Sequence, residues 1–239
     1  MKWVTSIRSV MNKEVIAVDG KTLRRSHDGD HKTAIHMVSA WATESNIVLG
    51  QVKTAEKSNE ITAIPELLKA LALKKSLVTI DAMGCQKTIA EAIVDKESDY
   101  LLAVKDNQPK LKEAIVASLS HRKPKNYVNP LIDFHEESEK NRGRKETRRC
   151  WTTTSLSKLD RVEDWKGLSQ IALVESERTI QGKTSIEQRY YICSATLSAQ
   201  ELLQSSRNHW GIENKLHWVL DMAFREDECR VRKGYGSEN

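Results

Sequence analysis

The chain has 239 residues, of which 39% are hydrophobic and 30% charged, and its formal net charge is +5. A chain of this length can bury most of its apolar surface, and no apolar run approaches the roughly 18 residues that cross a bilayer. The four cysteines show neither CxxC spacing nor a compact secreted framework, so we expect a cytoplasmic protein with reduced thiols and no membrane partner.

The first half of the chain predicts three strands followed by alternating helices and strands. A meander of strands and then right-handed crossovers produces a mixed sheet with helices on its faces, which is an α/β fold. The expected strands are 15–19, 34–43, 46–54, 76–81 and 99–105, and the expected helices are 59–73 and 86–96.

The second half predicts a different organisation. A helix at 109–120 precedes an antiparallel β-rich insertion at about 121–195. A final helical region begins near Ser198 and runs past Trp218, with Gly211 as a candidate break. We therefore divide the chain into a first core part (1–120), the insertion (121–195) and a C-terminal helical part of the core (196–239).

Two apolar strands end in a carboxylate. Asp19 follows "VIAV" and precedes Gly20, and Asp81 follows "LVTI" and precedes Ala82. Each could be an ordinary strand end that reaches solvent. In the predicted sheet, however, the first and fourth strands can lie side by side. Two carboxylates that close repel, so one of their pKa values should rise unless a cation sits between them. The pair therefore suggests a site for a hard divalent cation such as Mg²⁺.

The final helix offers a third acid. His209, Glu213, His217 and Asp221 recur every four residues and form one slowly drifting row beside an apolar face. Glu213 could point at the sheet or be a solvated surface acid. Zinc is a weak alternative, because three ligands at this spacing span about 12 Å along an α-helix.

Basic residues gather in two places. Three cations follow the first acid: Lys21, Arg24 and Arg25. They could hold the phosphates that flank a phosphate reacting at the metal site, or they could form an ordinary polar turn. The densest cationic run, "KNRGRKETRRCW", could be a solvated hairpin face, but beside an anionic metal site it suits DNA phosphate binding. Its candidate DNA contacts are Arg142, Arg144, Arg148 and Arg149.

Five stretches, in order, resemble the landmarks of the IS4-like DDE transposases of the ISAs1 family, which includes the H-repeat-associated proteins of enterobacteria. The stretches are "IAVDGKTLR", "TIDAMGCQ", "YLLAVKDNQP", "NRGRKETR" and "HWGIENKLHWVLDMAFREDECRVRKG". Each is ordinary alone, but the ordered set covers nearly the whole chain.

The resemblance implies a ribonuclease-H-like fold with a β-rich insertion before the last catalytic helix. It also implies Mg²⁺-dependent cleavage and joining of DNA strands at transposon ends, with two ions per site, Mn²⁺ as a substitute, and a homodimer acting on paired ends of double-stranded DNA. No small-molecule substrate is implied. Carried onto this sequence, the catalytic and metal-binding triad is Asp19, Asp81 and Glu213.

Three motifs depart from the family's pattern. The family's "KGNQ" reads Lys105, Asp106, Asn107, Gln108 in this chain, and its "HGR" reads Arg142, Gly143, Arg144. The Tyr, Arg, Glu, Lys signature of related IS4-type proteins has His209 in place of the arginine and Leu220 in place of the lysine. The resemblance gives the DNA-contacting roles to Lys105, Asn107, Gln108 and His209.

The chain begins about 13 residues before its first strand, whereas family members carry a helical region there and continue beyond "RKG". It therefore resembles a catalytic core clipped at both ends. Two alternatives to an active transposase stay open: an inactive remnant that only binds DNA, and a general metal-dependent nuclease.

Overall fold

The computed structural model describes residues 14–26, 34–54, 60–120, 131–141 and 143–228. Within this part of the chain, nine strands form a single sheet in the order β3-β2-β1-β4-β5-β9-β8-β7-β6. The strands are β1 (Val15–Thr22), β2 (His36–Ala42), β3 (Ile47–Lys53), β4 (Leu77–Ile80), β5 (Asp99–Val104), β6 (Asp133–Asn141), β7 (Arg144–Thr153), β8 (Gln170–Ile180) and β9 (Lys183–Cys193).

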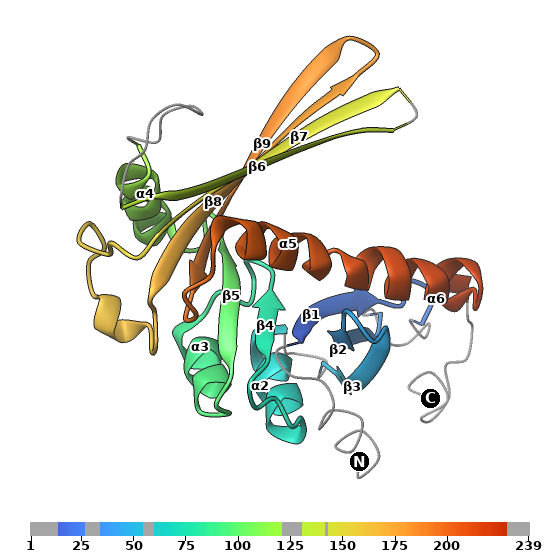
Figure 1. Cartoon of the computed structure of the whole chain (residues 1–239). Helices are drawn as coiled ribbons and strands as arrows, with labels where there is room; N and C mark the ends of the chain where they lie inside the picture. Colours follow the sequence, from blue (N-terminus) through green and yellow to red (C-terminus); the bar gives the residue numbers. More distant parts are fainter. Residues whose placement is uncertain (1–13, 27–33, 55–59, 121–130, 142, 229–239) are drawn as a thin grey trace.

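Helices lie on both faces of this sheet (Figure 1). β1, β4 and β5 are parallel to one another, and the other neighbours are antiparallel, so the mixed α/β sheet predicted from the sequence is confirmed. The helices are α2 (Glu60–Ala70), α3 (Lys87–Val94), α4 (Pro109–Ser118), α5 (Ala199–His209), η2 (Ile212–His217) and α6 (Trp218–Met222), with short 3₁₀ turns η1 (Val162–Asp164) and η3 (Glu226–Glu228).

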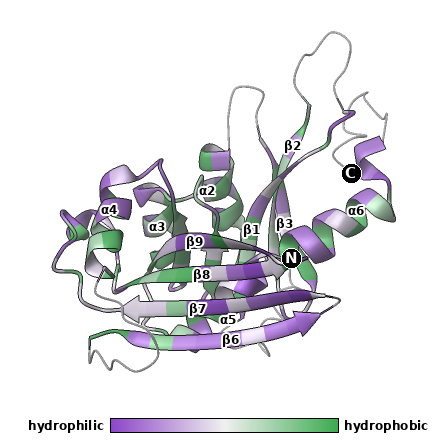
Figure 2. Cartoon of the chain, turned by 90° about the horizontal axis from the view of Figure 1, so that it is seen from above, coloured by the Kyte–Doolittle hydropathy of each residue, from purple (hydrophilic) through white to green (hydrophobic). Residues whose placement is uncertain are grey.

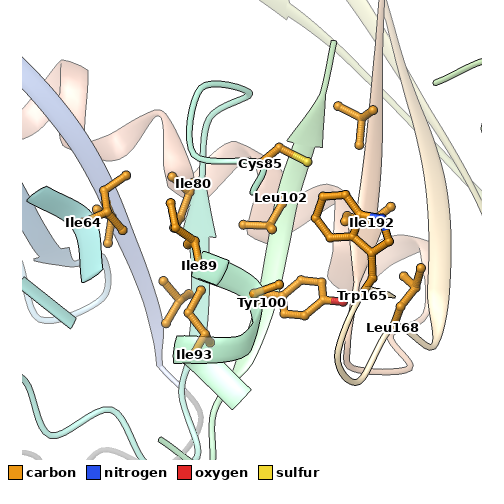
Figure 3. Packing of buried hydrophobic residues seen from close by; sticks show 14 of the residues in the cluster. Ile64, Ile80, Cys85, Ile89, Ile93, Tyr100, Leu102, Trp165, Leu168 and Ile192 are labelled. Carbon is orange, nitrogen blue, oxygen red and sulfur yellow. The ribbon is translucent and has the colours of Figure 1, made fainter. Parts of the chain in front are cut away.

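The larger core lies between the sheet and helices α2, α3 and α4. Alternate residues of the parallel strands, among them Ile80 and Leu102, pack there against Ile64 of α2 and Ile89 of α3 (Figure 3). Apolar residues three or four positions apart on these helices place one apolar stripe against the strands. Burial of this surface drives the pairing of strands that are distant in sequence.

The insertion strands β6 to β9 continue the same sheet, because β9 pairs antiparallel with β5 (Ala103 opposite Tyr191). Trp151 on β7 belongs to the main core, 6% exposed and 5.3 Å from the Phe134 ring, so its indole packs inside the fold. Toward their joined ends, β6 and β7 become hydrophilic (Figure 2). The insertion is therefore an apolar extension of the core sheet that ends in a polar hairpin.

Helix α5 covers the opposite face of the sheet (Figure 1). A capping box starts it, in which Ser198 Oγ accepts from the Glu201 amide and the Glu201 carboxylate accepts from the Ser198 amide. The sequence offered Gly211 as a break, but the backbone there keeps helical angles (φ −62°, ψ −32°) and continues into η2, a π-helix. The helix changes its hydrogen bonding without ending, which carries it along β1.

Candidate active site

The two predicted aspartates lie on neighbouring parallel strands. β1 and β4 pair as Ala17 with Thr79 and Val18 with Ile80, so Asp19 and Asp81 occupy the next positions along the two strands. Neighbouring strands are about 4.8 Å apart. The predicted adjacency of the first and fourth strands is therefore confirmed, and both carboxylates stand on the sheet face that α5 covers.

Glu213 of η2 shares a cavity of about 280 Å³ with both aspartates. The floor comes from β4, β5 and β9, and the helical wall comes from the end of α5 and the start of η2. Three carboxylates from β1, the end of β4 and η2 thus line one cavity, although 62 and 132 residues separate them in the chain (81 − 19 and 213 − 81).

The pKa values of all three carboxyls are raised. Burial raises the pKa of Asp19 to about 7, and the neighbouring charges of Glu60, Glu213 and Asp81 add to this effect, while a hydrogen bond from the Gly20 backbone opposes it. Burial also raises the pKa of Asp81 and, with the charge of Asp81, that of Glu213. The sequence led us to expect one raised pKa in a close carboxylate pair. In the structure, the pKa values of both aspartates and of Glu213 are raised.

The donor set suits a hard divalent cation. Carboxylate oxygens are the ligands that such cations prefer, and a bound cation would remove the repulsion that raises these pKa values. Among the described residues, no three His, Cys, Asp or Glu side chains converge closely enough to enclose an ion as they stand. The residues therefore fit a metal by donor type and shared cavity, and gathering them around an ion requires their side chains to move.

Three of the four side chains in the row predicted on the last helix contact the sheet, and the fourth, Glu213, is exposed and lines the cavity. The His209 ring lies 3.0 Å from the Thr79 hydroxyl, His217 Nδ1 lies 3.5 Å from Asp19 Oδ2, and Asp221 Oδ1 lies 2.7 Å from Lys21 Nζ. Residues four apart on an α-helix drift by about 40° per step. The wider turn of the π-helix reduces this drift, which keeps the row on one side.

The two histidines of this row stay neutral near neutral pH. Burial lowers the pKa of His209 to about 4, and burial together with the charge of Lys21 lowers the pKa of His217 to about 4. His209 was predicted to contact DNA. In this structure its half-buried ring contacts the Thr79 hydroxyl of β4 and so docks the end of α5 on the sheet, and the DNA contact stays a prediction.

Glu60 is a fourth acid at the site that the sequence analysis missed. Its Oε1 accepts a hydrogen bond from His36 Nε2 (2.7 Å), and it lies so close to Gly20 that a Cβ at that position would be 2.1 Å from it. Its charge raises the pKa of both Asp19 and Asp81. In the sequence it reads as an ordinary first-turn acid of α2, so nothing in the pattern singled it out.

Three predicted phosphate contacts follow Asp19. Lys21 is 9% exposed, and its ammonium lies within 4 Å of Asp221, Glu226 and Asp227. Arg24 is mostly exposed and contacts Asp227, and Arg25 is exposed. The charge of Lys21 is thus already balanced inside the protein, whereas the two arginines face outward.

The "KDNQ" segment divides into two parts. Lys105 is exposed, lines the cavity, and its charge opposes the rise of the Asp81 pKa. Asn107 Nδ2 donates to Ala82 O (2.6 Å), and Gln108 Nε2 donates to Cys85 O (3.0 Å). The two amides therefore hold the loop that follows Asp81, and Lys105 is the exposed cation that this segment brings to the cavity.

The predicted cations of the insertion lie in ion pairs. Arg144 and Arg148 contact Glu146, which is 2% exposed, and Arg149 contacts Glu136, Glu175 and Glu177. Arg142 lies outside the described residues. Arg144 remains 44% exposed and Arg148 only 12%, so Arg144 is the more accessible of the two.

A groove of about 560 Å³ joins this insertion face to the carboxylate cavity. The cavity and the groove share Glu187, Arg189, Ser206, Trp210 and Glu213. The guanidinium of Arg189 lies 4.2 Å from the centre of the Trp210 ring, at the junction. Three arginines of the groove were missed in the sequence because they lie outside the dense basic run: Arg178, Arg189 and Arg207.

This arrangement of a mixed sheet, paired strand-end carboxylates and a third acid on a late helix is the one that the resemblance to the DDE transposases predicts. The family model described as "Transposase DDE domain" matches residues 11–239, so the chain belongs to this family. The described part of the chain contains no helix both long and apolar enough to span a membrane.

Relatives with full coverage of this chain come from Escherichia coli. The chain is 47% identical to "Putative transposase YncI" of strain O157:H7 and 44% identical to "H repeat-associated putative transposase YhhI" of strain K12. It is also 44% identical to "Putative protein YbfL" of strain K12. The chain spans 62 to 64% of the length of these three relatives.

Proposed function

We propose that this chain is the catalytic core of an ISAs1-type transposase that cleaves and joins DNA strands at the ends of an insertion sequence in the cytoplasm. The observation that carries the proposal is the single cavity lined by Asp19, Asp81 and Glu213, all three with a raised pKa. Groups whose ionised form is disfavoured until a cation arrives are suited to metal-assisted phosphoryl chemistry.

Asp19, Asp81 and Glu213 are the residues that would hold the metal. Divalent cations at this position, Mg²⁺ or Mn²⁺ and two per site, would stabilise the attacking and leaving oxygens of an in-line displacement. In the proposed reaction, water cleaves a phosphodiester at the element end and releases a 3′-hydroxyl, which then attacks target DNA. No covalent protein intermediate is required.

The protein's cations would hold the DNA strands. Lys105 stands at the cavity, and Arg189 stands where the cavity meets the groove, so both are placed beside a phosphate that approaches the carboxylates. Farther along the groove, Arg144 and Arg178 are 44% and 43% exposed and each pairs with Glu146. Glu146 itself is buried, but both guanidinium groups reach the surface of the groove, where a phosphate would meet them without displacing Glu146. Arg24 and Arg25 extend the basic surface past β1.

A plasmid-nicking assay tests the proposal. The substrate is a supercoiled plasmid that carries an element end, incubated with Mg²⁺ or Mn²⁺. We expect Asp19→Asn to lower the nicking rate by about 10³-fold, the equivalent of several kcal/mol of transition-state stabilisation, without loss of DNA binding. Glu113→Gln, which alters an exposed acid of α4, is the matched control and should nick like the wild type.

The same assay separates the alternatives. DNA binding without cation-dependent nicking would indicate a protein that only binds DNA. Nicking without preference for the element end would indicate a general nuclease. A homodimer on paired ends is proposed from the family, and sedimentation of the chain with two end duplexes would detect it.

A further inference from the structure

Helices η2 and α6 lie along one face of β1, and residues further along the strand contact residues further along the helices. Successive residues of a strand alternate between its faces, so Ala17, Asp19 and Lys21 point the same way. Ala17 packs with Ile212 and Leu216 of η2, Asp19 faces His217, and Lys21 meets Asp221 of α6. Each inward-facing residue of β1 therefore contacts a helix residue that lies further along the chain than the one before.

Lys21 is the polar end of this interface. Its side chain is 9% exposed, and its Nζ lies 2.7 Å from Asp221 Oδ1, 2.8 Å from Glu226 Oε2 and 3.4 Å from Asp227 Oδ1. Removing one partner from a buried ion pair is costly, because it leaves the other charge uncompensated. The ammonium thus joins β1 to both α6 and η3.

A second polar contact lies on the other side of Glu213. The ring of His209 contacts the hydroxyl of Thr79 at 3.0 Å, which fixes the end of α5 on β4. Glu213 stands four residues after His209 and eight before Asp221. The π-helix that carries Glu213 is therefore held at both ends, on β4 by His209 and on β1 by Lys21.

We propose that Lys21 is a positioning residue, which holds Asp221 and thereby sets η2 along β1 so that Glu213 faces Asp19 and Asp81. The proposal rests on the proposed function, in which Glu213 is the third acid of the site. It replaces the phosphate-binding role that the sequence suggested for Lys21.

The local charges favour the positioning role. Three carboxylates surround one ammonium, so the cluster carries a net charge of −2 when all are ionised (1 − 3). A phosphate that approached Lys21 would have to displace a carboxylate and would meet the remaining ones at close range, where like charges repel. Arg24, which is 81% exposed, offers a phosphate much easier access.

Binding of Mn²⁺ tests the proposal without requiring catalysis. We would compare Lys21→Met, Asp221→Asn and the double variant by electron paramagnetic resonance of free Mn²⁺ and by hydrogen exchange of residues 212–217. Lys110→Met, an exposed lysine of α4, is the matched control. We expect each single variant to weaken Mn²⁺ binding about tenfold or more and to speed exchange in η2. The double variant should be little worse than either single one, because both remove the same contact.

A salt titration of DNA affinity tests the rival role, in which Lys21 contacts a DNA phosphate. If Lys21→Met lowers the salt slope by about one and leaves Mn²⁺ affinity unchanged, Lys21 contacts phosphate and the proposal is wrong. If Lys21→Met does not fold, Asp221→Asn, which keeps Lys21 beside two carboxylates, tests the positioning role by Mn²⁺ binding and hydrogen exchange: weaker binding and faster exchange support it, and unchanged values overturn it. If the wild type binds no Mn²⁺, the proposed function fails, and hydrogen exchange alone decides the positioning role: faster exchange supports it and unchanged exchange overturns it.

Discussion

Carboxylates behave in opposite ways in the two halves of the sheet. At the ends of β1 and β4, burial and neighbouring acids raise the pKa of Asp19 and Asp81. On the insertion, the guanidinium of Arg148 lowers the pKa of Glu139. The same chemical group is thus left uncompensated in one region and matched by a cation in the other. Repulsion between carboxylates is therefore relieved by arginines on the insertion, and it persists at the cavity where a metal would bind.

The largest expected effect is a loss of stability with rising pH, caused by the uncompensated carboxyl of Asp19. Because the folded-state pKa of Asp19 is about 7 and lies above its ordinary value of 3.8, the folded protein keeps a proton that the unfolded chain has lost. Stability without metal should therefore fall as the pH rises from about 4 through about 7. Between pH 5 and pH 8 we expect Asp19 to account for about 2 to 3 kcal/mol.

Urea unfolding with a chelator at the two pH values measures this loss. Asp19→Asn should remove that part of the pH dependence, whereas Asp160→Asn, an exposed control, should keep the wild-type profile. Added Mn²⁺ should stabilise the wild type more at pH 8 than at pH 5. Identical profiles for Asp19→Asn and the wild type would show that Asp19 is not the uncompensated group.

The next effect is the loss of stability when a buried acid of the insertion, Glu146, is removed from its ion pairs. Glu146 is 2% exposed and pairs with Arg144, Arg148 and Arg178, so its loss leaves partly buried guanidinium groups without their shared partner. We expect Glu146→Gln to lower the free energy of unfolding by about 2 kcal/mol, below the full cost of breaking a buried pair, because the side chains of Arg144 and Arg178 are 44% and 43% exposed. Glu139→Gln, at a position that is 45% exposed, should cost under about 1 kcal/mol in the same urea titration. Equal costs would mean that burial of Glu146 contributes nothing special.

The smallest effect concerns DNA affinity. Replacing both Arg144 and Arg178 with glutamine should reduce the slope of log affinity against log salt by about two, with little dependence on DNA sequence. A fluorescence titration at several salt concentrations measures this slope. Arg161→Gln, an exposed arginine before η1, is the control and should leave it unchanged. An unaltered slope in the double variant would place the DNA elsewhere on the protein.

Most of the fold could be predicted from local patterns. Apolar strand runs and helical stripes gave the correct order of elements, and the adjacency of β1 and β4 followed from the rules for parallel crossovers. The pairing of β9 with β5 could not be predicted, because the register of a distant strand depends on packing across the whole sheet. The π-helix after Gly211 has no distinct sequence signal.

The site was predicted less completely than the fold. Asp19, Asp81 and Glu213 stood out because acids beside apolar runs are unusual, and whether they act as proposed awaits the nicking assay. The surroundings of Glu60 and Lys21 could not be predicted from the sequence. Each has an ordinary local context, and its surroundings come from elements far away in the chain: His36 for Glu60, and the acids of α6 and η3 for Lys21.

The pairing of β5 with β9 also bears on how the protein is made. Residue 104 leaves the ribosome 86 residues before residue 190 (190 − 104), which is about 4 to 17 s at ordinary rates of synthesis. During that time the edge of β5 lacks its partner, and an unpaired edge invites association with other chains. Glu213 is made later still. A growing chain that has not reached Glu213 would therefore lack one of the three proposed catalytic acids, so in the proposed chemistry it could not cut DNA before that residue is added.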